Sequence, residues 1–219
     1  MRFCSISRQR YLFVAIDRVK RWVFVQIKSH KTAAAARSFL NALHKACPIK
    51  IQKFLTDNGK EFTDRLVVSR ERQATGNNEF DQLCQALSIE HRLTQPRTPM
   101  TKGVVERFNG RIAHVLKTHL FTSGEDLERT LMRYVALYNR QLSQSELKSK
   151  TPMRGMKDWY ASHPHLFVKR PYYHPGCDIQ QPRSVVAGKS QSKGLKWITN
   201  STLRCVCPLR LGQAFRPAN

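Results

Sequence analysis

The sequence predicts an α/β domain with a mixed sheet, because strand-like and helix-like segments alternate along the chain. Two β-rich apolar runs open the sequence, and amphipathic helical segments then alternate with further short apolar runs. The chain has 219 residues, of which 41% are hydrophobic, so one domain of about 150 residues with extra segments is expected. No apolar run approaches the roughly 18 residues that span a bilayer, which argues against a membrane protein.

Each element of this domain follows from a local pattern. Two runs rich in β-branched and aromatic side chains flank a polar turn and predict a hairpin, over residues 11–16 and 22–27. Helices are predicted where apolar residues recur every three or four positions, within residues 33–46, 80–87, 104–116 and 127–138. Ser123, with Asp126 three residues later, resembles a capping box at the start of the last helix. Further strands are predicted over residues 49–55 and 89–93.

The charge of the chain indicates its partner. Lys and Arg number 38 and Asp and Glu number 15, which gives a net charge of +23 and a pI near 10.4. Such an excess repels the compact state unless a polyanion neutralises part of it, so nucleic acid is the leading partner. Membrane surfaces are less favoured because no amphipathic anchor accompanies the charge. The basic N-terminus has no hydrophobic signal core, which predicts a cytoplasmic location.

The last part of the chain has a different composition. Residues 179–219 contain seven Lys or Arg and no Asp or Glu, and their apolar periodicity is poor. This pattern predicts a basic, disordered tail. The tail either binds DNA without sequence preference or is unselected sequence, and composition does not separate the two.

Two of the fifteen acids stand apart from the others. Asp57 directly follows a predicted buried strand, and strand ends of this kind are where α/β sheets build their sites. Glu106 lies near the start of a predicted helix, where Gly103 and Gly110 leave room on its face for a bulky substrate. A plain helix-start acid is the alternative for Glu106. Paired carboxylates in a strongly basic protein suggest Mg²⁺ or Mn²⁺ holding phosphate oxygens.

The other charged residues near these acids have simpler interpretations. Arg107 and Arg111 form a neighbouring stripe on the same helix that could contact phosphates. Asp64, Glu71 and Asp81 lie among arginines and are predicted to be surface acids.

The motifs around these acids resemble a known family. LTDNGKEF at residues 55–62 and HRLTQPRTPMTKGVVERFNGR at residues 91–111 resemble the integrase-type catalytic core of bacterial insertion-sequence transposases, which are related to retroviral integrases. The resemblance extends from about residue 11 to residue 178. It implies an RNase H-like fold, with a mixed five-stranded sheet flanked by helices, and three acidic metal ligands in the order Asp, Asp, Glu.

Carried over by motif, the resemblance implies a role for several residues. Asp57 matches the second acid and Glu106 the third, so both are expected to be catalytic and to bind metal, with two Mg²⁺ or Mn²⁺ ions in an intact site. The DNA-binding residues it implies are Asn58, Lys102, Arg107, Asn109 and Arg111. The partners it implies are transposon ends and target DNA, with a homo-oligomer on the DNA, no membrane, and a location at the bacterial nucleoid.

The first acid of the family has no clear match. In the family it sits in a strand that precedes the segment matching residues 11–17, and residues 1–10 contain no acid. Asp17 is the early candidate, but it matches the acid of the hairpin turn, where its expected role is to order the turn or to pair with Arg18 or Arg21. We therefore expect an N-terminally truncated chain whose first strand and upstream helix-turn-helix region are missing or degraded.

These inferences divide the chain into four parts. They are a first-strand remnant (1–10), an integrase-type core (11–142), an extension of the core (143–178) and the basic tail (179–219). The expected reaction is metal-assisted cleavage and joining of DNA strands at transposon ends, in an incomplete copy. The alternative is a catalytically inactive remnant that still binds DNA. A basic ribosome-associated protein would account for the charge but not for the paired motifs.

Overall fold

A computed structural model describes residues 10–64, 78–94, 103–171 and 202–210. The strands in these ranges are β1 (Tyr11–Asp17), β2 (Val23–Lys28), β3 (Lys53–Thr56), β4 (Glu90–Leu93) and β5 (Thr202–Arg210). The helices are α1 (Ala33–Ala46), α2 (Glu79–Ala86), α3 (Gly103–Thr118), α4 (Gly124–Arg140) and α5 (Pro152–Ser162), with short 3-10 turns at Ser145–Leu147 and Pro164–Leu166.

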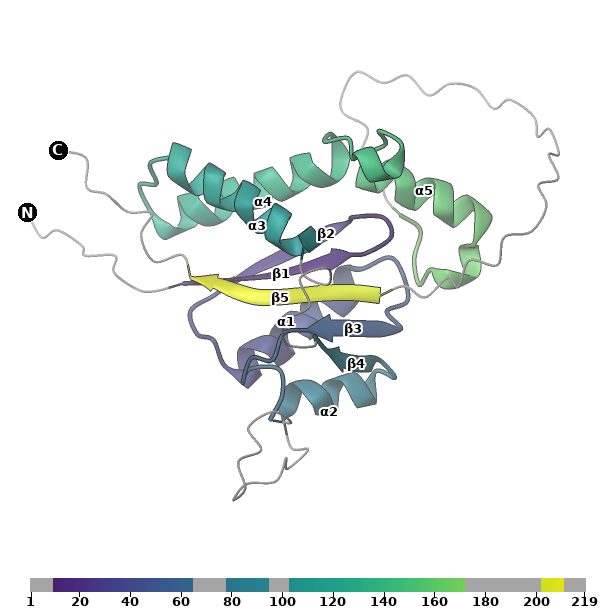
Figure 1. Cartoon of the computed structure of the whole chain (residues 1–219), viewed down its shortest axis with the longest axis horizontal. Coiled ribbons are helices and arrows are strands. Elements are labelled where there is room, and N and C mark those ends of the chain that lie inside the picture. The colour runs from purple at the N-terminus through teal and green to yellow at the C-terminus, as the bar shows by residue number, and fades with distance from the viewer. Residues whose placement is uncertain (1–9, 65–77, 95–102, 172–201, 211–219) are drawn as a thin grey trace, which may run out of the picture.

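The five strands form one mixed sheet in the order β2-β1-β5-β3-β4 (Figure 1). The β1–β2 hairpin is antiparallel, with Val14 opposite Val25. β5 runs antiparallel to β1 and parallel to β3, and β3 is parallel to β4. The predicted fold class, a mixed five-stranded sheet flanked by helices, is confirmed.

The central strand comes from a part of the chain that the sequence predicts to be disordered. Thr202–Arg210 lies between β1 and β3 and pairs with both. The prediction of disorder therefore does not hold for these nine residues. Their strand conformation depends on backbone hydrogen bonds to two neighbours rather than on their own apolar pattern. The rest of the predicted tail, and the predicted remnant up to residue 9, lie outside the described residues.

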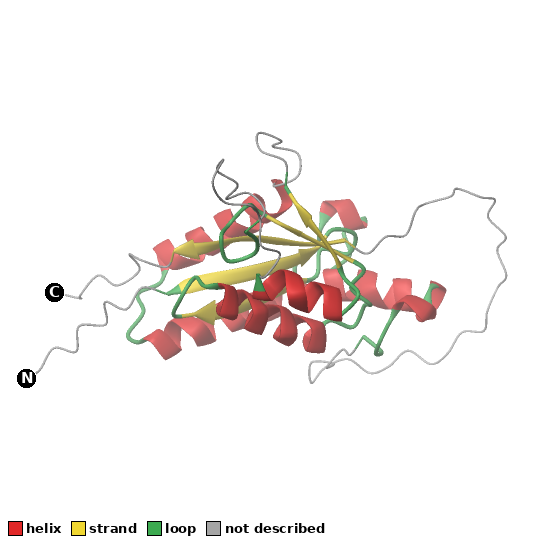
Figure 2. Ribbon diagram, turned by 90° about the horizontal axis from the view of Figure 1, so that it is seen from below, coloured by secondary structure: helices red, strands yellow, loops and turns green. Residues whose placement is uncertain are grey.

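Helices cover both faces of the sheet (Figure 2). On one face, α1 and α2 pack on β1 and β3 through a core that contains Phe13, Phe39, Phe54 and Phe80. On the other face, α3 and α4 pack on the hairpin through a core that contains Val14. The alternation of β1 explains this division, because successive side chains of a strand point to opposite faces.

Local capping determines where the helices begin. The Thr32 hydroxyl accepts a hydrogen bond from the Ala35 backbone N–H at 3.2 Å, which caps α1. The Ser123 hydroxyl does the same for Asp126 at 3.1 Å, which confirms the predicted cap of α4. β3 is shorter than predicted, because Ile49 makes only an isolated bridge to Phe167. Among the described residues no helix is long and apolar enough to cross a membrane.

Candidate functional site

The turn after β3 presents Asp57 at the carboxyl end of the strand. The Gly59 backbone N–H donates to Asp57 Oδ1 at 3.3 Å, and the Gly59 carbonyl accepts from the Phe62 N–H at 3.0 Å. Phe62 is fully buried and anchors the turn in the core. Asp57 is half-buried, and the hydrogen bond that it accepts from Gly59 is long. The turn thus fixes the position of the carboxylate, which accepts little internal hydrogen bonding.

A buried network supports this turn from below. His91 of β4 contacts Asp81 through Nδ1 at 2.5 Å and the Thr56 hydroxyl through Nε2 at 2.8 Å. Thr63 donates to the other Asp81 oxygen at 3.4 Å. The Asp81 prediction was wrong, since this acid is 3% exposed rather than on the surface. The network joins β3, β4, α2 and the turn, so it fixes the residue that immediately precedes Asp57.

A second acid lies in the same turn. Glu61 is 4% exposed, and its carboxylate forms an ion pair with Lys31 Nζ at 3.2 Å. A Cβ added to Gly59 would come within 2.5 Å of Glu61 Oε1, so the close approach of this carboxylate requires glycine at position 59. The sequence analysis did not assign Glu61, because nothing local distinguishes it from a surface acid.

Glu106 lies on α3 and is exposed, whereas Val105, Phe108 and Ile112 of the same helix are buried. α3 packs against β5 and β1. In Figure 1 its first turn is drawn over the β1–β2 hairpin, beside β5. Asp57 follows a strand that pairs with β5, and Glu106 lies on a helix that packs against β5, so both come from neighbours of the central strand.

Two amides next to these acids have buried oxygens without partners. Neither Asn58 Oδ1 nor Asn109 Oδ1 has a hydrogen-bond partner among the described residues. Asn58 follows Asp57, and Asn109 is one helical turn after Glu106. Carboxylate and amide oxygens are the hard donors that Mg²⁺ prefers, so the donor set fits a divalent cation. No group of three or more His, Cys, Asp or Glu able to hold a metal occurs in the described part of the chain.

The pairing register identifies the residue of β5 that lies level with Asp57. Leu55 of β3 pairs with Arg204 of β5, and Val206 is two residues further along, as Asp57 is from Leu55. Val206 also pairs with Val14, whose side chain belongs to the core beneath α3. The strand position next to Asp57 thus carries valine, in a strand that contains no acid.

Asp17 lies elsewhere. It pairs with Leu203, which in turn pairs with Phe54, so Asp17 is level with a residue three positions before Asp57. That offset is about 10 Å along the strands, with two strand spacings of about 5 Å in addition. Asp17 Oδ2 instead accepts the Lys20 backbone N–H at 2.6 Å, the turn-ordering role that the sequence predicts. Burial raises the pKa of this carboxyl, and hydrogen bonds from the turn lower it in part.

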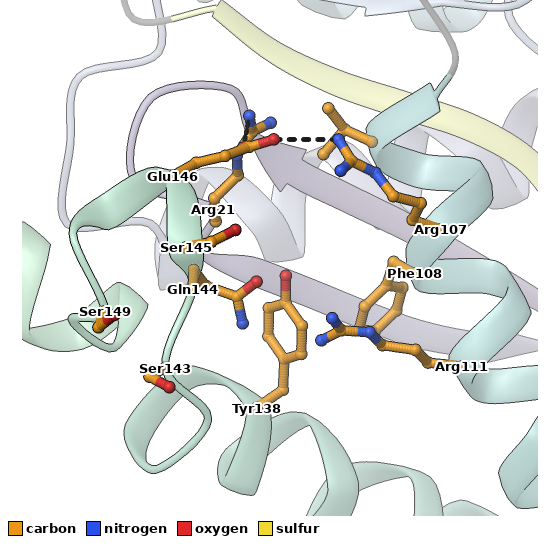
Figure 3. Close-up of a pocket in the computed structure, with 11 residues that line it drawn as sticks. Arg21, Arg107, Phe108, Arg111, Tyr138, Ser143, Gln144, Ser145, Glu146 and Ser149 are labelled. Carbon is orange, nitrogen blue, oxygen red and sulfur yellow. Dashed lines mark hydrogen bonds and ion pairs between the residues drawn. The ribbon is translucent and has the colours of Figure 1, made fainter.

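The predicted DNA-contacting arginines of α3 line a pocket of about 360 Å³ (Figure 3). We call it the guanidinium pocket, defined by Arg21, Arg107, Arg111, Tyr138 and Glu146. Glu146 forms ion pairs with Arg21 and with Arg107, the latter at 3.1 Å. The Arg111 guanidinium lies over the Tyr138 ring at 5.6 Å. Lys102, the remaining predicted DNA contact, lies outside the described residues.

Sequence reasoning missed three members of this pocket. Arg21 comes from the hairpin turn, Tyr138 from the end of α4 and Glu146 from the following 3-10 turn. They are distant from Arg107 along the chain, and no motif links them. Of the three, Arg21 alone had a sequence feature that could have drawn attention to it: it is a charged residue at the end of a tight turn.

Comparison with known proteins identifies the fold. Two models of the integrase core domain match residues 2–99 and residues 87–152. The catalytic core domain of BIV integrase is a similar solved structure, with a TM-score of 0.51, 20% identity, and coverage of 70% of this chain and 87% of that one. This likeness assigns the RNase H-like fold.

Two curated relatives point the same way. The retrovirus-related Pol polyprotein from transposon TNT 1-94 of Nicotiana tabacum is 26% identical over 118 residues, which is 53% of this chain. The protein named "Putative integrase ORF3" of Spiroplasma virus SpV1-C74 is 25% identical over 158 residues, or 68% of this chain. The matches span 8% and 42% of those two proteins. The two family matches overlap and together cover residues 2–152, and with this fold they support an integrase-type catalytic core in this chain.

Proposed function

We propose that this protein is the core of a DNA transposase or integrase, an incomplete copy of an enzyme that cleaves and joins DNA strands, and that it binds divalent metal through Asp57 and Glu106. One observation carries the proposal. A half-buried aspartate with little internal bonding follows a strand that pairs with the central strand of an integrase-type fold, and an exposed glutamate lies on the helix that packs against that strand. Buried, unpartnered amide oxygens of Asn58 and Asn109 accompany them.

The side chains of this site have two roles, metal binding and positioning. Asp57 and Glu106 would hold Mg²⁺ or Mn²⁺, and the ions, when bound, activate the attacking oxygen and stabilise the leaving one. Asn58 and Asn109 lie beside the acids and orient phosphate or water through their free amide groups. The net charge of +23 draws the DNA backbone to the surface and makes binding strongly dependent on salt.

The wider biological assignment belongs to the same proposal. The partners are transposon ends and target DNA, held by a homo-oligomer that brings two DNA ends together. The assignment to a bacterial insertion sequence and to the nucleoid rests on the sequence motifs alone.

A second function is favoured by a different observation. β5 carries valine at position 206, where a third carboxylate would complete the site next to Asp57. With two carboxylates instead of three, the site is less able to fix two ions about 3.5–4 Å apart. The alternative is therefore a protein that binds DNA and has lost strand transfer.

One experiment separates the two functions. Nicking and joining of supercoiled plasmid are measured with Mg²⁺ and with Mn²⁺ for the wild type, Val206→Asp and the uncharged control Val206→Asn. We expect the wild type to be nearly inert and Val206→Asp to gain metal-dependent activity, because its carboxylate completes the site. Adding Asp57→Asn or Glu106→Gln should abolish that gain. Thermal unfolding with and without Mg²⁺ checks that each variant folds and whether it binds the ion.

The outcomes are distinct. If all variants bind DNA, and neither the wild type nor Val206→Asp shows any metal-dependent activity, the strand-transfer proposal fails and the DNA-binding alternative stands. If the wild type is already active and Asp57→Asn stops it, two carboxylates suffice and the alternative fails.

A further inference from the structure

Three separate elements build the guanidinium pocket. Arg107 and Arg111 lie one turn apart on α3, Arg21 comes from the β1–β2 turn, and Glu146 is supplied by the loop after α4. That loop is closed by a backbone hydrogen bond from the Gln144 N–H to the Lys150 carbonyl, at 3.0 Å. The pocket is thus a defined concavity rather than a patch of surface arginines, and Figure 3 shows the side chains converging from its two sides.

Arg21 adopts a strained backbone conformation in the turn. Its φ is 59°, in the left-handed region where glycine is favoured and an arginine is strained. Its side chain is 15% exposed, and its Nη1 is buried without a hydrogen-bond partner among the described residues. Burial lowers the pKa of Arg21, and the nearby Arg107 lowers it further. A guanidinium held in this way retains unused capacity for an anion.

Glu146 occupies the place of that anion. Its carboxylate lies between the Arg21 and Arg107 guanidiniums and bridges them (Figure 3). It is the one acid among the lining residues, against three arginines. Arg107 is 67% exposed at its side chain and Glu146 41%, so this bridge is open to solvent and to exchange.

The opposite wall suits a nucleotide unit. The exposed Arg111 guanidinium is stacked on the buried Tyr138 ring, which holds its planar group beside the other arginines. A volume of about 360 Å³ is at the small end of ligand pockets, which begin at about 300 Å³. Guanidinium forks bind phosphate oxygens in pairs, and aromatic and guanidinium planes stack on bases and sugars.

We propose that the guanidinium pocket binds a backbone phosphate of a DNA strand, and that Glu146 is an internal competitor for the same arginines. This inference rests on the proposed function. It goes beyond that function by adding Arg21, Tyr138 and Glu146 to the DNA contacts. Arg107 is the neighbour of Glu106 on α3 and points to a different face of the helix. A phosphate bound in the pocket would therefore fix the strand one helix face away from the carboxylates.

Binding of a labelled duplex, measured by fluorescence anisotropy in EDTA over a salt series, tests the proposal. Arg21→Gln and Arg107→Gln should each weaken binding about tenfold and lower the slope of log affinity against log salt by about 1. Arg133→Gln is the matched control, since Arg133 is an exposed arginine of α4 outside the pocket. Glu146→Gln should strengthen binding, because the competitor is gone, and by more than Glu128→Gln, which removes an exposed charge of α4.

Three results would overturn the proposal. The first is losses in Arg21→Gln and Arg107→Gln no larger than that in Arg133→Gln. The second is a Glu146→Gln variant that binds no better than Glu128→Gln. The third is tight, Arg21-dependent binding of deoxyadenosine 5′-monophosphate together with duplex binding that ignores Arg21, which would make the ligand a free nucleotide. Arg111→Gln, which leaves the Glu146 bridge intact, gives a second reading if Arg21→Gln fails to fold.

The same measurements keep this proposal apart from the proposed function. In EDTA no metal is bound at Asp57, so weaker duplex binding by the pocket variants reports on the pocket and not on the metal site. If the pocket variants lose duplex binding and no metal-dependent activity is found, the pocket proposal stands without the strand-transfer function. If the pocket variants bind normally while metal-dependent activity requires Asp57, the strand-transfer function stands and the pocket proposal falls.

Discussion

The turn after β1 and the turn after β3 each carry an aspartate at the end of a buried strand. In the first turn, Asp17 is buried and accepts a short hydrogen bond from Lys20. In the second, Asp57 is half-buried and accepts one long bond from Gly59. The first turn uses its carboxylate for its own structure and presents Arg21 instead. The second is held by neighbours, and its carboxylate stays available for a ligand.

The comparison shows that the surroundings, not the aspartate, decide the role. The Asp57 turn is supported by His91 and Asp81 beneath it and by the packing of Gly59 against Glu61. In the Asp17 turn, Asn139 of α4 bonds both the N–H and the carbonyl of Val23, and the Asp17 carboxylate itself accepts the Lys20 N–H. The following predictions test this difference, from the largest expected effect to the smallest.

Replacing the support beneath Asp57 should have the largest effect. His91→Ala removes the 2.5 Å contact of His91 with the buried Asp81 carboxylate, and losing one member of a buried charged pair costs about 3–5 kcal/mol of unfolding free energy. Urea unfolding measures this loss. His119→Ala, at an exposed histidine, is the control and should change stability by less than about 0.5 kcal/mol. Equal effects in the two variants would mean that the network does not support the turn.

The glycine of the Asp57 turn gives the next largest effect. Gly59→Ala places a Cβ 2.5 Å from the Glu61 carboxylate, so this buried carboxylate, which pairs with Lys31, must shift. We expect a loss of about 1–3 kcal/mol. Gly110→Ala on α3 is the matched control, because no atom lies within 4 Å of its added Cβ and alanine favours the helix by about 1 kcal/mol. Thermal unfolding of both variants should therefore shift in opposite directions.

The buried carboxyl of Asp17 predicts a dependence of stability on pH. Burial raises its pKa in the folded state above the ordinary 3.8, so the folded protein holds this proton more tightly than the unfolded chain. Its contribution to stability is fully present below the unfolded pKa and is lost as pH rises through the raised folded pKa.

Asp17→Asn removes this titration and keeps an oxygen that accepts the Lys20 N–H. The variant should gain stability relative to the wild type as pH rises from about 4 to 7. Urea unfolding of both proteins at several pH values gives the difference directly. Parallel stability curves would show that the Asp17 carboxyl does not change its proton affinity on folding.

The smallest effect on stability is expected at Asp57 itself. Asp57→Asn should change the unfolding free energy by less than about 0.5 kcal/mol without metal, because the carboxylate has little internal bonding. With Mg²⁺, the wild type should be stabilised and Asp57→Asn should not. A large loss without metal would mean that Asp57 serves the turn as Asp17 does, and the contrast between the two turns would disappear.

Much of the fold could be predicted from the sequence because helices, caps and hairpins are local. The apolar periodicity of residues 33–46 predicts α1 with its observed bounds, and Ser123 caps α4 as its spacing to Asp126 indicates. The motif around Asp57 predicts the turn, since strand, aspartate and glycine are adjacent in the chain. The same kind of reasoning predicts that Arg107 and Arg111 share a stripe of α3.

Only the tertiary structure decided the rest. Thr202–Arg210 becomes the central strand because β1 and β3 offer it backbone partners, which its own pattern does not predict. Asp81 is buried because His91 and Thr63 approach it from other elements. Arg21 meets Glu146 across 125 positions of the chain. The free energy of burying or pairing a side chain depends on neighbours that are distant in sequence, so these roles were settled when the elements packed together.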